Sequence, residues 1–215
     1  MRNERASSAA RVRQLYEDWA DSYSEMMDSE INLPLYSDTL GRLAERIADI
    51  EGSVVDTSCG PGHMLSMFHE RYDSNRLLIG IDLSPNMVAA ADARLGRSAH
   101  IQTGDMRDSI NVEPNSSSAV LSFFALHHLD RTEIPATLRE WHRILYSGGQ
   151  LVIATWEGEG VIDYGDDTDD VVAFKYTKDE IAAWTKEAGF VVDRCVVEPV
   201  EGMPMNALYL EGTKL

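Results

Sequence analysis

The chain has 215 residues, of which 44% are hydrophobic, and a formal net charge of −17. This length suits one α/β domain with its own core; no apolar run approaches the roughly 18 residues of a membrane span, and the acidic charge argues against a nucleic-acid partner. The N-terminus lacks the apolar stretch of a secretory signal, and Cys59 and Cys195 alone form neither a disulfide framework nor a metal site, so we expect a cytoplasmic protein without a bound metal.

The first 50 residues predict two amphipathic helices. Residues 7–28 carry apolar side chains at steps of four and three, and a second helix follows Pro34. The apolar positions of the first helix are Val12, Tyr16, Trp19, Tyr23 and Met26. We expect residues 1–50 to form a helical cap over the carboxyl ends of the strands that follow, where open α/β sheets bind ligands.

From residue 51 onward, apolar strands alternate with helices, which indicates a parallel sheet covered on both faces. The last connection, through Pro199 and Pro204, has no helix, so the final two strands are expected to form an antiparallel hairpin. Gly148 and Gly149 are expected to end the helix before the fifth strand. We therefore expect residues 1–215 to form one domain, with a core over 51–215 and an insertion loop at 157–175. The predicted strands are 53–57, 77–82, 99–103, 119–124, 150–156, 190–197 and 206–212.

A run of small residues, Asp56 to Gly62 (DTSCGPG), stands at the first strand-to-helix turn. Glycines there let a ligand approach the backbone, and the helix start offers free N–H groups; a tight turn without a ligand is the alternative. The dinucleotide fingerprint requires a third glycine, but that position is Leu65, which argues against a nicotinamide cofactor.

The next two strand ends carry groups suited to a nucleoside. Asp82 follows Gly62 by 20 residues, where a carboxylate accepts hydrogen bonds from ribose hydroxyls. Asp105 can accept from the exocyclic amine of a purine, and Met106 and Leu83 can pack on its ring. Taken alone, Asp82 could be a helix cap and Asp105 part of a turn. Together with the glycine corner, however, they place nucleoside-suited groups at three neighbouring strand ends, and this combination predicts a nucleoside site.

Several segments resemble the class I S-adenosylmethionine-dependent methyltransferases of the small-molecule type. These are VVDTSCGPG, GIDLSPNMV, GDM, AVLSFFALHHLD, WHRILYSGGQLVIATW and KEAGF, which cover residues 50–156 well and the rest loosely. Ser58 departs from the pattern, because the family has the first glycine of its corner there. The resemblance implies an α/β, Rossmann-like, doubly wound seven-stranded sheet, mostly parallel with an antiparallel last strand, helices on both faces and an N-terminal helical cap.

The resemblance also implies S-adenosylmethionine as the cofactor and S-adenosylhomocysteine as its product. The corner would hold the methionine part, Asp82 the ribose and Asp105 the adenine, while Phe123 would lie near the sulfonium. The N-terminal helix would close over the cofactor, or its aromatic residues simply pack in the core. The expected cofactor-binding residues are Tyr16, Tyr23, Asp56, Ser58, Gly60, Gly62, Asp82, Leu83, Met87, Asp105, Met106 and Phe123.

The sequence gives weaker evidence about the residues that bind the methyl acceptor. His127 and His128 follow the fourth strand and could serve as a catalytic base or contact the substrate, although this motif occurs in relatives with different substrates. Trp156 and Tyr176 flank the insertion and could line the acceptor pocket or serve in packing. The acidic run 163–170 is expected to be an exposed loop; a lid, or a patch for a cationic substrate, is the alternative.

We therefore expect methyl transfer to an oxygen, nitrogen or sulfur atom of a small-molecule metabolite. Two alternatives stay open at this point: a non-catalytic S-adenosylmethionine-binding regulatory or scaffold protein, and an NAD-dependent oxidoreductase. The sequence leaves the identity of the acceptor and the oligomeric state open.

Overall fold

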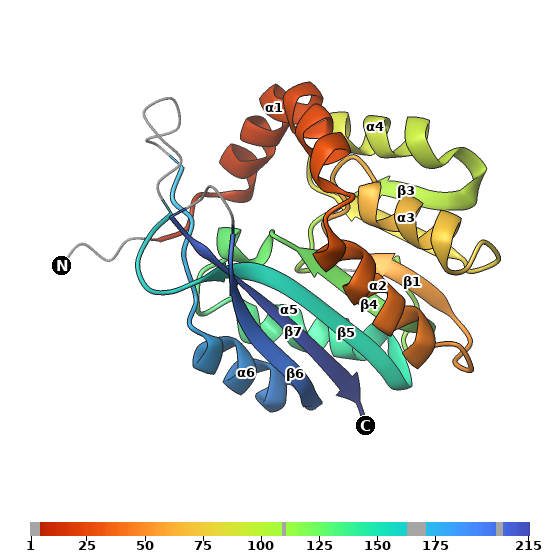
Figure 1. Ribbon diagram of the computed structural model, residues 1–215. Helices are drawn as coiled ribbons and strands as arrows, with labels where there is room; N and C mark the ends of the chain where they lie inside the picture. Colours follow the sequence, from red (N-terminus) through yellow and green to blue (C-terminus); the bar gives the residue numbers. More distant parts are fainter. Residues whose placement is uncertain (1–4, 109–110, 163–170, 201–203) are drawn as a thin grey trace.

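A computed structural model describes residues 5–108, 111–162, 171–200 and 204–215. Its centre is a seven-stranded sheet in the order β3-β2-β1-β4-β5-β7-β6 (Figure 1). β7 runs antiparallel to both of its neighbours, β5 and β6, and the other neighbouring pairs are parallel, so the predicted sheet and its closing hairpin are confirmed. The strands are β1 Ser53–Asp56, β2 Leu78–Asp82, β3 Ala99–Thr103, β4 Ser117–Phe123, β5 Leu145–Glu157, β6 Phe190–Pro199 and β7 Asn206–Lys214.

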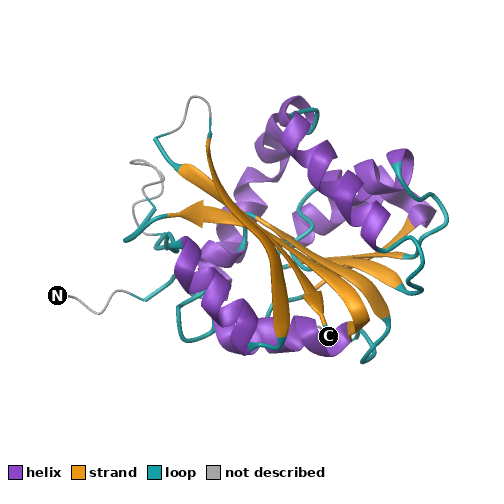
Figure 2. Ribbon diagram, turned by 60° about the horizontal axis from the view of Figure 1, so that its bottom comes forward, coloured by secondary structure: helices purple, strands orange, loops and turns teal. Residues whose placement is uncertain are grey.

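Helices cover both faces of the sheet (Figure 2). One hydrophobic cluster joins α2, α3 and α4 to Val54 of β1, and a second joins α5 and α6 to the neighbouring Val55. This split follows from the strand period of two, which sends adjacent side chains to opposite faces. The helices are α1 Ala9–Glu30, α2 Pro34–Arg46, α3 His63–Arg71, α4 Pro85–Leu95, α5 Ile134–Ile144 and α6 Lys178–Glu187, with short 3₁₀ helices η1 Gly96–Ser98 and η2 Leu126–His128.

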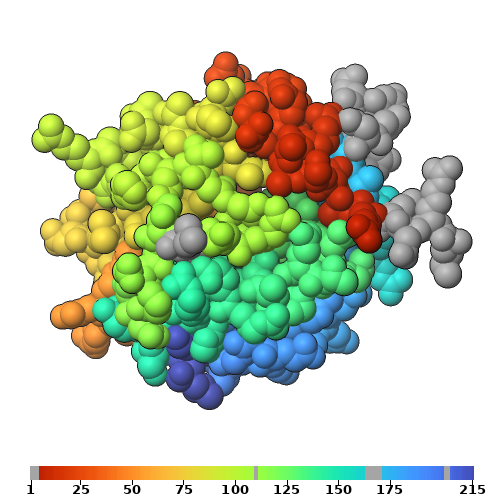
Figure 3. Space-filling view, turned by 180° about the vertical axis from the view of Figure 1, so that it is seen from behind, coloured from red at the N-terminus to blue at the C-terminus, as the bar shows by residue number. Residues whose placement is uncertain are grey.

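The two N-terminal helices have different positions. α1 lies over the carboxyl ends of the central strands and bonds to the start of α4, where the Asn86 amide donates to the Glu17 carbonyl at 3.0 Å. α2 packs against one sheet face through Leu40 and Leu43. In the view from behind, the surface of α1 (red) meets that of the middle of the chain (green) (Figure 3). The part of the helical cap that lies over the strand ends is therefore α1.

The start of α1 is tied to the insertion after β5. The backbone N–H of Ser7 donates to the Val172 carbonyl at 2.9 Å, and the N–H of Val172 donates to the Ser7 hydroxyl at 2.8 Å. The acidic run 163–170, predicted to be an exposed loop, lies outside the described residues. None of the helices in the described part of the chain has the length and apolar composition needed to span a bilayer.

The expected end of the helix before the fifth strand is wrong. Gly148 and Gly149 do not end α5, which ends at Ile144; both lie inside β5, which begins at Leu145. Leu145 already pairs with Ser117 of β4, and the register then shifts, so sheet pairing extends the strand across the glycines. Gly148 takes the left-handed φ of 82° in this irregular stretch, which is why a glycine is suited there.

Candidate active site

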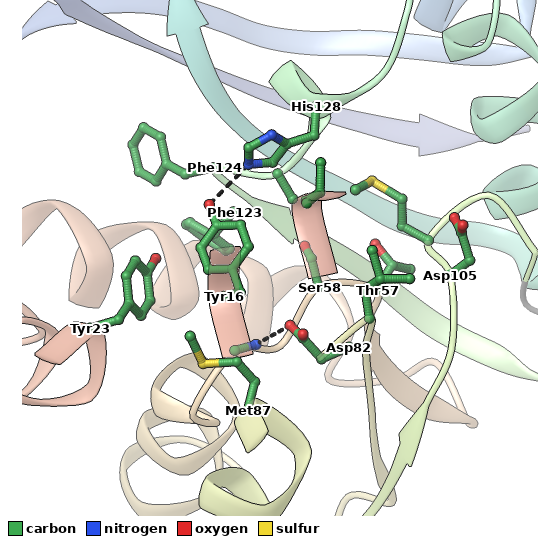
Figure 4. A pocket seen from close by; sticks show the side chains of 15 residues that line it. Tyr16, Tyr23, Thr57, Ser58, Asp82, Met87, Asp105, Phe123, Phe124 and His128 are labelled. Atoms are coloured by element: carbon green, nitrogen blue, oxygen red, sulfur yellow. Dashed lines mark hydrogen bonds between the residues drawn. The ribbon is translucent and has the colours of Figure 1, made fainter. Parts of the chain in front are cut away.

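A cavity opens at the carboxyl ends of β1, β2 and β4, beneath α1 (Figure 4). This main cavity encloses about 560 Å³ of empty space, part of it open to solvent. Most of the residues expected to bind a cofactor line it, although the sequence places them on separate elements. These are Tyr16, Tyr23, Ser58, Gly60, Asp82, Leu83, Met87, Asp105, Met106 and Phe123.

A smaller adjoining cavity, of about 390 Å³, continues from the main one on the side of α3. Asp56 and His63 line it, together with Tyr36 of α2. The two cavities share part of their walls, so an elongated ligand can extend from one into the other. The shared residues are Tyr23, Ser58, Gly60, Phe123 and Phe124.

Asp82, the last residue of β2, holds the glycine corner through a hydrogen bond. Asp82 accepts the backbone N–H of Gly60 at 2.8 Å through Oδ2 and that of Ser84 at 2.9 Å through Oδ1. Gly60 has a φ of 49°, which favours glycine. Asp82 therefore also holds the loop that resembles a cofactor-binding corner.

Gly62 does not line either cavity. It precedes α3 with a φ of 83°, and an added Cβ would approach Leu95 at 3.0 Å and Ala91 at 3.2 Å. The contact that the structure assigns to this glycine is thus the close packing of α3 against α4.

Two buried carboxyl groups, those of Asp56 and Asp82, favour a ligand that donates hydrogen bonds or carries positive charge. Burial raises the pKa of Asp56 to about 7, and the nearby charge of Asp82 adds to this. Burial also raises the pKa of Asp82 to about 6, although its backbone N–H partners oppose the shift. No lysine or arginine of the described chain lines the main or the adjoining cavity. A ligand with hydroxyl donors or positive charge would relieve this unfavourable burial.

Asp105 is held as an ionised acceptor. Arg107 Nε donates to its Oδ1 at 2.9 Å, and Arg107 also bonds Glu133 at 2.6 Å. Burial alone would raise the pKa of Asp105, but the hydrogen bonds and charge of Arg107 outweigh it and lower the pKa. The Met106 carbonyl accepts from the Trp141 indole at 2.9 Å, which fixes the loop beside it.

The two adjacent histidines differ in position. His128 lines the main cavity, and its Nε2 lies 2.9 Å from the Tyr16 hydroxyl of α1. Burial lowers the pKa of His128 to about 4, so its ring is neutral at pH 7. His127 is buried behind it and lines neither cavity; its carbonyl accepts the Phe174 N–H at 2.8 Å.

The two residues expected beside the acceptor do not line these cavities. Trp156 packs on Phe124, with ring centroids 4.7 Å apart. Tyr176 is fully buried in the core on the α5 and α6 side, where its hydroxyl donates to the Leu129 carbonyl. The Arg131 guanidinium lies 5.0 Å from the Tyr176 ring centroid. The structure therefore gives Tyr176 a packing position.

Phe124 is a cavity residue that the sequence reasoning misses. It lines both cavities and adopts a φ of 49°, uncommon for a residue with a large side chain. Its N–H donates to the Ala154 carbonyl at 2.8 Å, which holds the turn out of β4. Backbone strain of this kind is common at functional sites. In the sequence, the only signal for Phe124 is its position next to Phe123.

In sequence, the central part of the chain is similar to known methyltransferases. Residues 54–149 match the family described as "Methyltransferase domain". An uncharacterized methyltransferase of Geobacillus thermodenitrificans is 29% identical over 144 residues, which span 65% of this chain and 64% of that relative's length. A second, from Bacillus mycoides, is 26% identical over 144 residues, 65% of each chain.

Solved structures share the fold at low identity. The 1,6-didemethyltoxoflavin-N1-methyltransferase of Burkholderia thailandensis, with its substrate and S-adenosylhomocysteine bound, has a TM-score of 0.73 at 20% identity, covering 96% of this chain and 88% of that one. The 4+2 cyclase SpnF has a TM-score of 0.73 at 15% identity, covering 98% of each chain. Residues 54–149 thus match a methyltransferase domain, and the chain resembles the class I S-adenosylmethionine-dependent methyltransferases in sequence motifs and in fold.

Proposed function

We propose that the protein binds S-adenosylmethionine and transfers its methyl group to an oxygen, nitrogen or sulfur atom of a small molecule. The observation that carries this proposal is the main cavity, where Gly60, Asp82 and Asp105 meet from the ends of three neighbouring strands. Their chemistry fits a nucleoside with a positively charged side arm, since the buried carboxyl groups of Asp82 and Asp56 line the main and the adjoining cavity, and no described lysine or arginine lines either cavity.

The residues divide by the part of the cofactor that they suit. Asp82 has acceptor capacity for ribose hydroxyls beyond its two backbone bonds, and ionised Asp105 suits the adenine amine. Leu83 and Met106 offer apolar contacts to the adenine ring. Asp56 and the adjoining cavity would take the methionine part. When bound, S-adenosylmethionine supplies a methyl group that its positive sulfur has already activated.

The cavity lining also favours a class of acceptor. Aromatic rings and carboxyl groups surround the space, so a neutral or cationic acceptor suits it better than an anionic one. His128 is the better placed of the two histidines to contact the acceptor or accept its proton, because it lines the cavity and its ring is neutral at pH 7. His127 would act only through its neighbour, and Trp156 would reach the acceptor only from behind Phe124.

Two other functions fit the chain less well. The fold is shared with a cyclase, so the fold alone does not distinguish a methyltransferase from a protein that keeps the site without transfer. An NAD-dependent oxidoreductase is disfavoured by Leu65, fully buried where a dinucleotide corner needs its third glycine. One domain over residues 1–215, a cytoplasmic location and the lack of a nucleic-acid partner stay predictions.

The test is a calorimetric titration with S-adenosylmethionine, S-adenosylhomocysteine and NAD, followed by thermal unfolding with each. Binding of the first two without NAD supports the proposal, and a ligand at a hundredfold excess over its dissociation constant should stabilise the fold by about 2.7 kcal/mol. Binding of NAD alone contradicts it. Release of S-adenosylhomocysteine on addition of a metabolite extract then separates a transferase from a protein that only binds the cofactor.

A further inference from the structure

Two buried tyrosines carry hydroxyl groups that the fold does not use. Tyr36 of α2 is 6% exposed and Tyr209 of β7 is 2% exposed, yet neither hydroxyl has a hydrogen-bond partner in the described part of the chain. Neither oxygen is among the partnerless polar atoms that are sealed from solvent, so both reach accessible space. A buried tyrosine hydroxyl usually finds a partner within the protein. These two therefore keep their hydrogen-bonding capacity for a ligand.

Both side chains lie against the phenylalanine pair at the end of β4. Tyr36 lines the adjoining cavity, and its ring centroid is 6.1 Å from that of Phe123. Tyr209 packs edge to face on Phe124, with centroids 6.2 Å apart, and Phe124 lines both cavities. Burial raises the pKa of Tyr209 most, and the nearby Tyr36 adds to the shift. The two tyrosines therefore approach one region of the cavity wall from α2 and from β7.

The charged groups around these hydroxyls are acidic. Burial raises the pKa of Tyr36 to about 12, and the charge of Glu30 adds to the shift. Glu198 acts on the pKa of Tyr209 in the same direction. Asp56 lines the adjoining cavity, where no lysine or arginine of the described chain is found. The hydroxyls are thus neutral at pH 7 and lie in a negative field, which favours a cation.

We propose that Tyr36, with Tyr209 beside it, binds the ammonium group of a cationic methyl acceptor; this rests on the proposed function. A tyrosine oxygen can accept from the ammonium N–H groups, and a hydrogen bond to a charged partner is stronger than a neutral one. The rings of Phe123 and Phe124 suit the same charge and the apolar body of the acceptor. Tyr36 is then a specificity-determining residue that separates amines from neutral and acidic compounds of the same shape.

The experiment uses benzylammonium, benzyl alcohol and benzoate, which share a ring and one further carbon but differ in charge at pH 7. Each probe is titrated into wild type saturated with S-adenosylhomocysteine, and NMR signals of ¹³C-labelled tyrosine rings report binding. Wild type should prefer benzylammonium to benzyl alcohol by at least about tenfold, or about 1.4 kcal/mol, and bind benzoate least. Tyr36→Phe should reduce the preference to less than about threefold and leave S-adenosylhomocysteine affinity within about twofold.

Tyr72→Phe is the matched control. The Tyr72 hydroxyl is used within the fold, because it donates to the Ser37 carbonyl at 2.6 Å, and Tyr72 lines neither the main nor the adjoining cavity. Tyr72→Phe should lower the melting temperature and keep the preference for benzylammonium. Tyr36→Phe should do the reverse, since the hydroxyl that it removes makes no hydrogen bond in the ligand-free protein.

Three results would overturn the inference: no binding of benzylammonium to wild type, an unchanged preference in Tyr36→Phe, or displacement of S-adenosylhomocysteine by benzylammonium. The last would assign Tyr36 to the amino-acid arm of the cofactor instead of the acceptor. If Tyr36→Phe does not fold, Tyr209→Phe decides by the same criteria. A wild type that does not bind S-adenosylhomocysteine overturns the proposed function itself. The preference for benzylammonium, measured on the free protein, then still decides whether the tyrosines bind an ammonium group.

Discussion

Tyr16 and His128, 112 residues apart in the chain, meet through a hydrogen bond of 2.9 Å between the Tyr16 hydroxyl and His128 Nε2. Their rings also pack edge to face, with centroids 5.4 Å apart. The contact joins α1 to the short helix that follows β4, across the main cavity. The helix that covers the cavity is therefore linked to the histidine that lines it.

Tyr16→Phe should loosen this link without removing the ring. We expect the free energy of unfolding to fall by about 1 kcal/mol, because a typical hydrogen bond contributes about 1 kcal/mol to stability. We expect cofactor affinity to fall about threefold to fivefold, because α1 is then held less firmly over the cavity. Urea unfolding and calorimetry measure the two effects. Tyr146→Phe, at an exposed site on β5, is the control. Unchanged affinity in Tyr16→Phe would show that α1 does not help to hold the cofactor.

His128→Gln tests the proposed base. The glutamine amide can still bond the Tyr16 hydroxyl, but it cannot take a proton from the acceptor. We expect cofactor affinity to stay within about twofold, and the turnover number to fall by about a hundredfold if general base catalysis is used. Release of S-adenosylhomocysteine with an identified acceptor provides the rate. Wild-type turnover would exclude His128 as the base.

Asp82→Asn should affect binding and stability together. The variant keeps one carbonyl oxygen, so it cannot accept both Gly60 and Ser84 N–H groups as the carboxylate does. We expect cofactor affinity to fall at least about tenfold and the free energy of unfolding to fall by about 1–3 kcal/mol. Asp92→Asn, on the exposed side of α4, controls for the loss of an acid. If binding is unchanged while stability falls, Asp82 is only a support of the corner.

Asp56 should make stability depend on pH. Its folded pKa is about 7, against about 3.9 in an unfolded chain, so the folded state binds more protons between these values. The free energy of unfolding therefore falls as pH rises from about 4 to about 7. Asp56→Asn removes this contribution and should gain on the order of 4 kcal/mol relative to wild type between pH 4 and pH 8, because each unit of pKa difference corresponds to about 1.4 kcal/mol. Urea unfolding at both pH values measures it; a constant difference would mean that Asp56 does not titrate in this range.

Tyr176→Phe separates packing from substrate contact. Its hydroxyl donates to the Leu129 carbonyl inside the core, so we expect the free energy of unfolding to fall by about 1 kcal/mol. Cofactor affinity and the Michaelis constant for an acceptor should not change, since Tyr176 lines neither cavity. A raised Michaelis constant with unchanged stability would instead restore the acceptor role that the sequence suggested.

The sequence predicts the sheet well because its signals are local. Asp56, Asp82 and Asp105 each lie at or just after the end of a strand, and helical segments separate the three strands. The topology of a parallel sheet brings the carboxyl ends of these strands together, so the three side chains lie on the same side of the sheet. Helix starts are equally local: Ser84 and Pro85 begin α4 as their types suggest. For the same reason, most of the expected cofactor-binding residues line one cavity.

What the sequence misses depends on contacts between distant segments. The left-handed turn at Phe124 and the burial of Tyr176 are set by packing across the sheet, and neither has a local signature. The glycines at 148 and 149 look like a helix end, but pairing of Leu145 with Ser117 overrides them. Ser58 is visible as a departure from a motif, whereas its unpartnered hydroxyl is visible only in three dimensions.

The antiparallel course of β7 has a practical consequence for measurement. Because β7 runs antiparallel to β5, with Asn206 opposite Glu157 and Thr213 opposite Gln150, the chain reaches Leu215 at the end of the sheet opposite the cavity, while Ser7 and Ser8 lie beside α1 near the cavity. Leu215 is 79% exposed. A fluorophore or an immobilisation tag joined to Leu215 would therefore lie away from the cavity and leave ligand entry unobstructed.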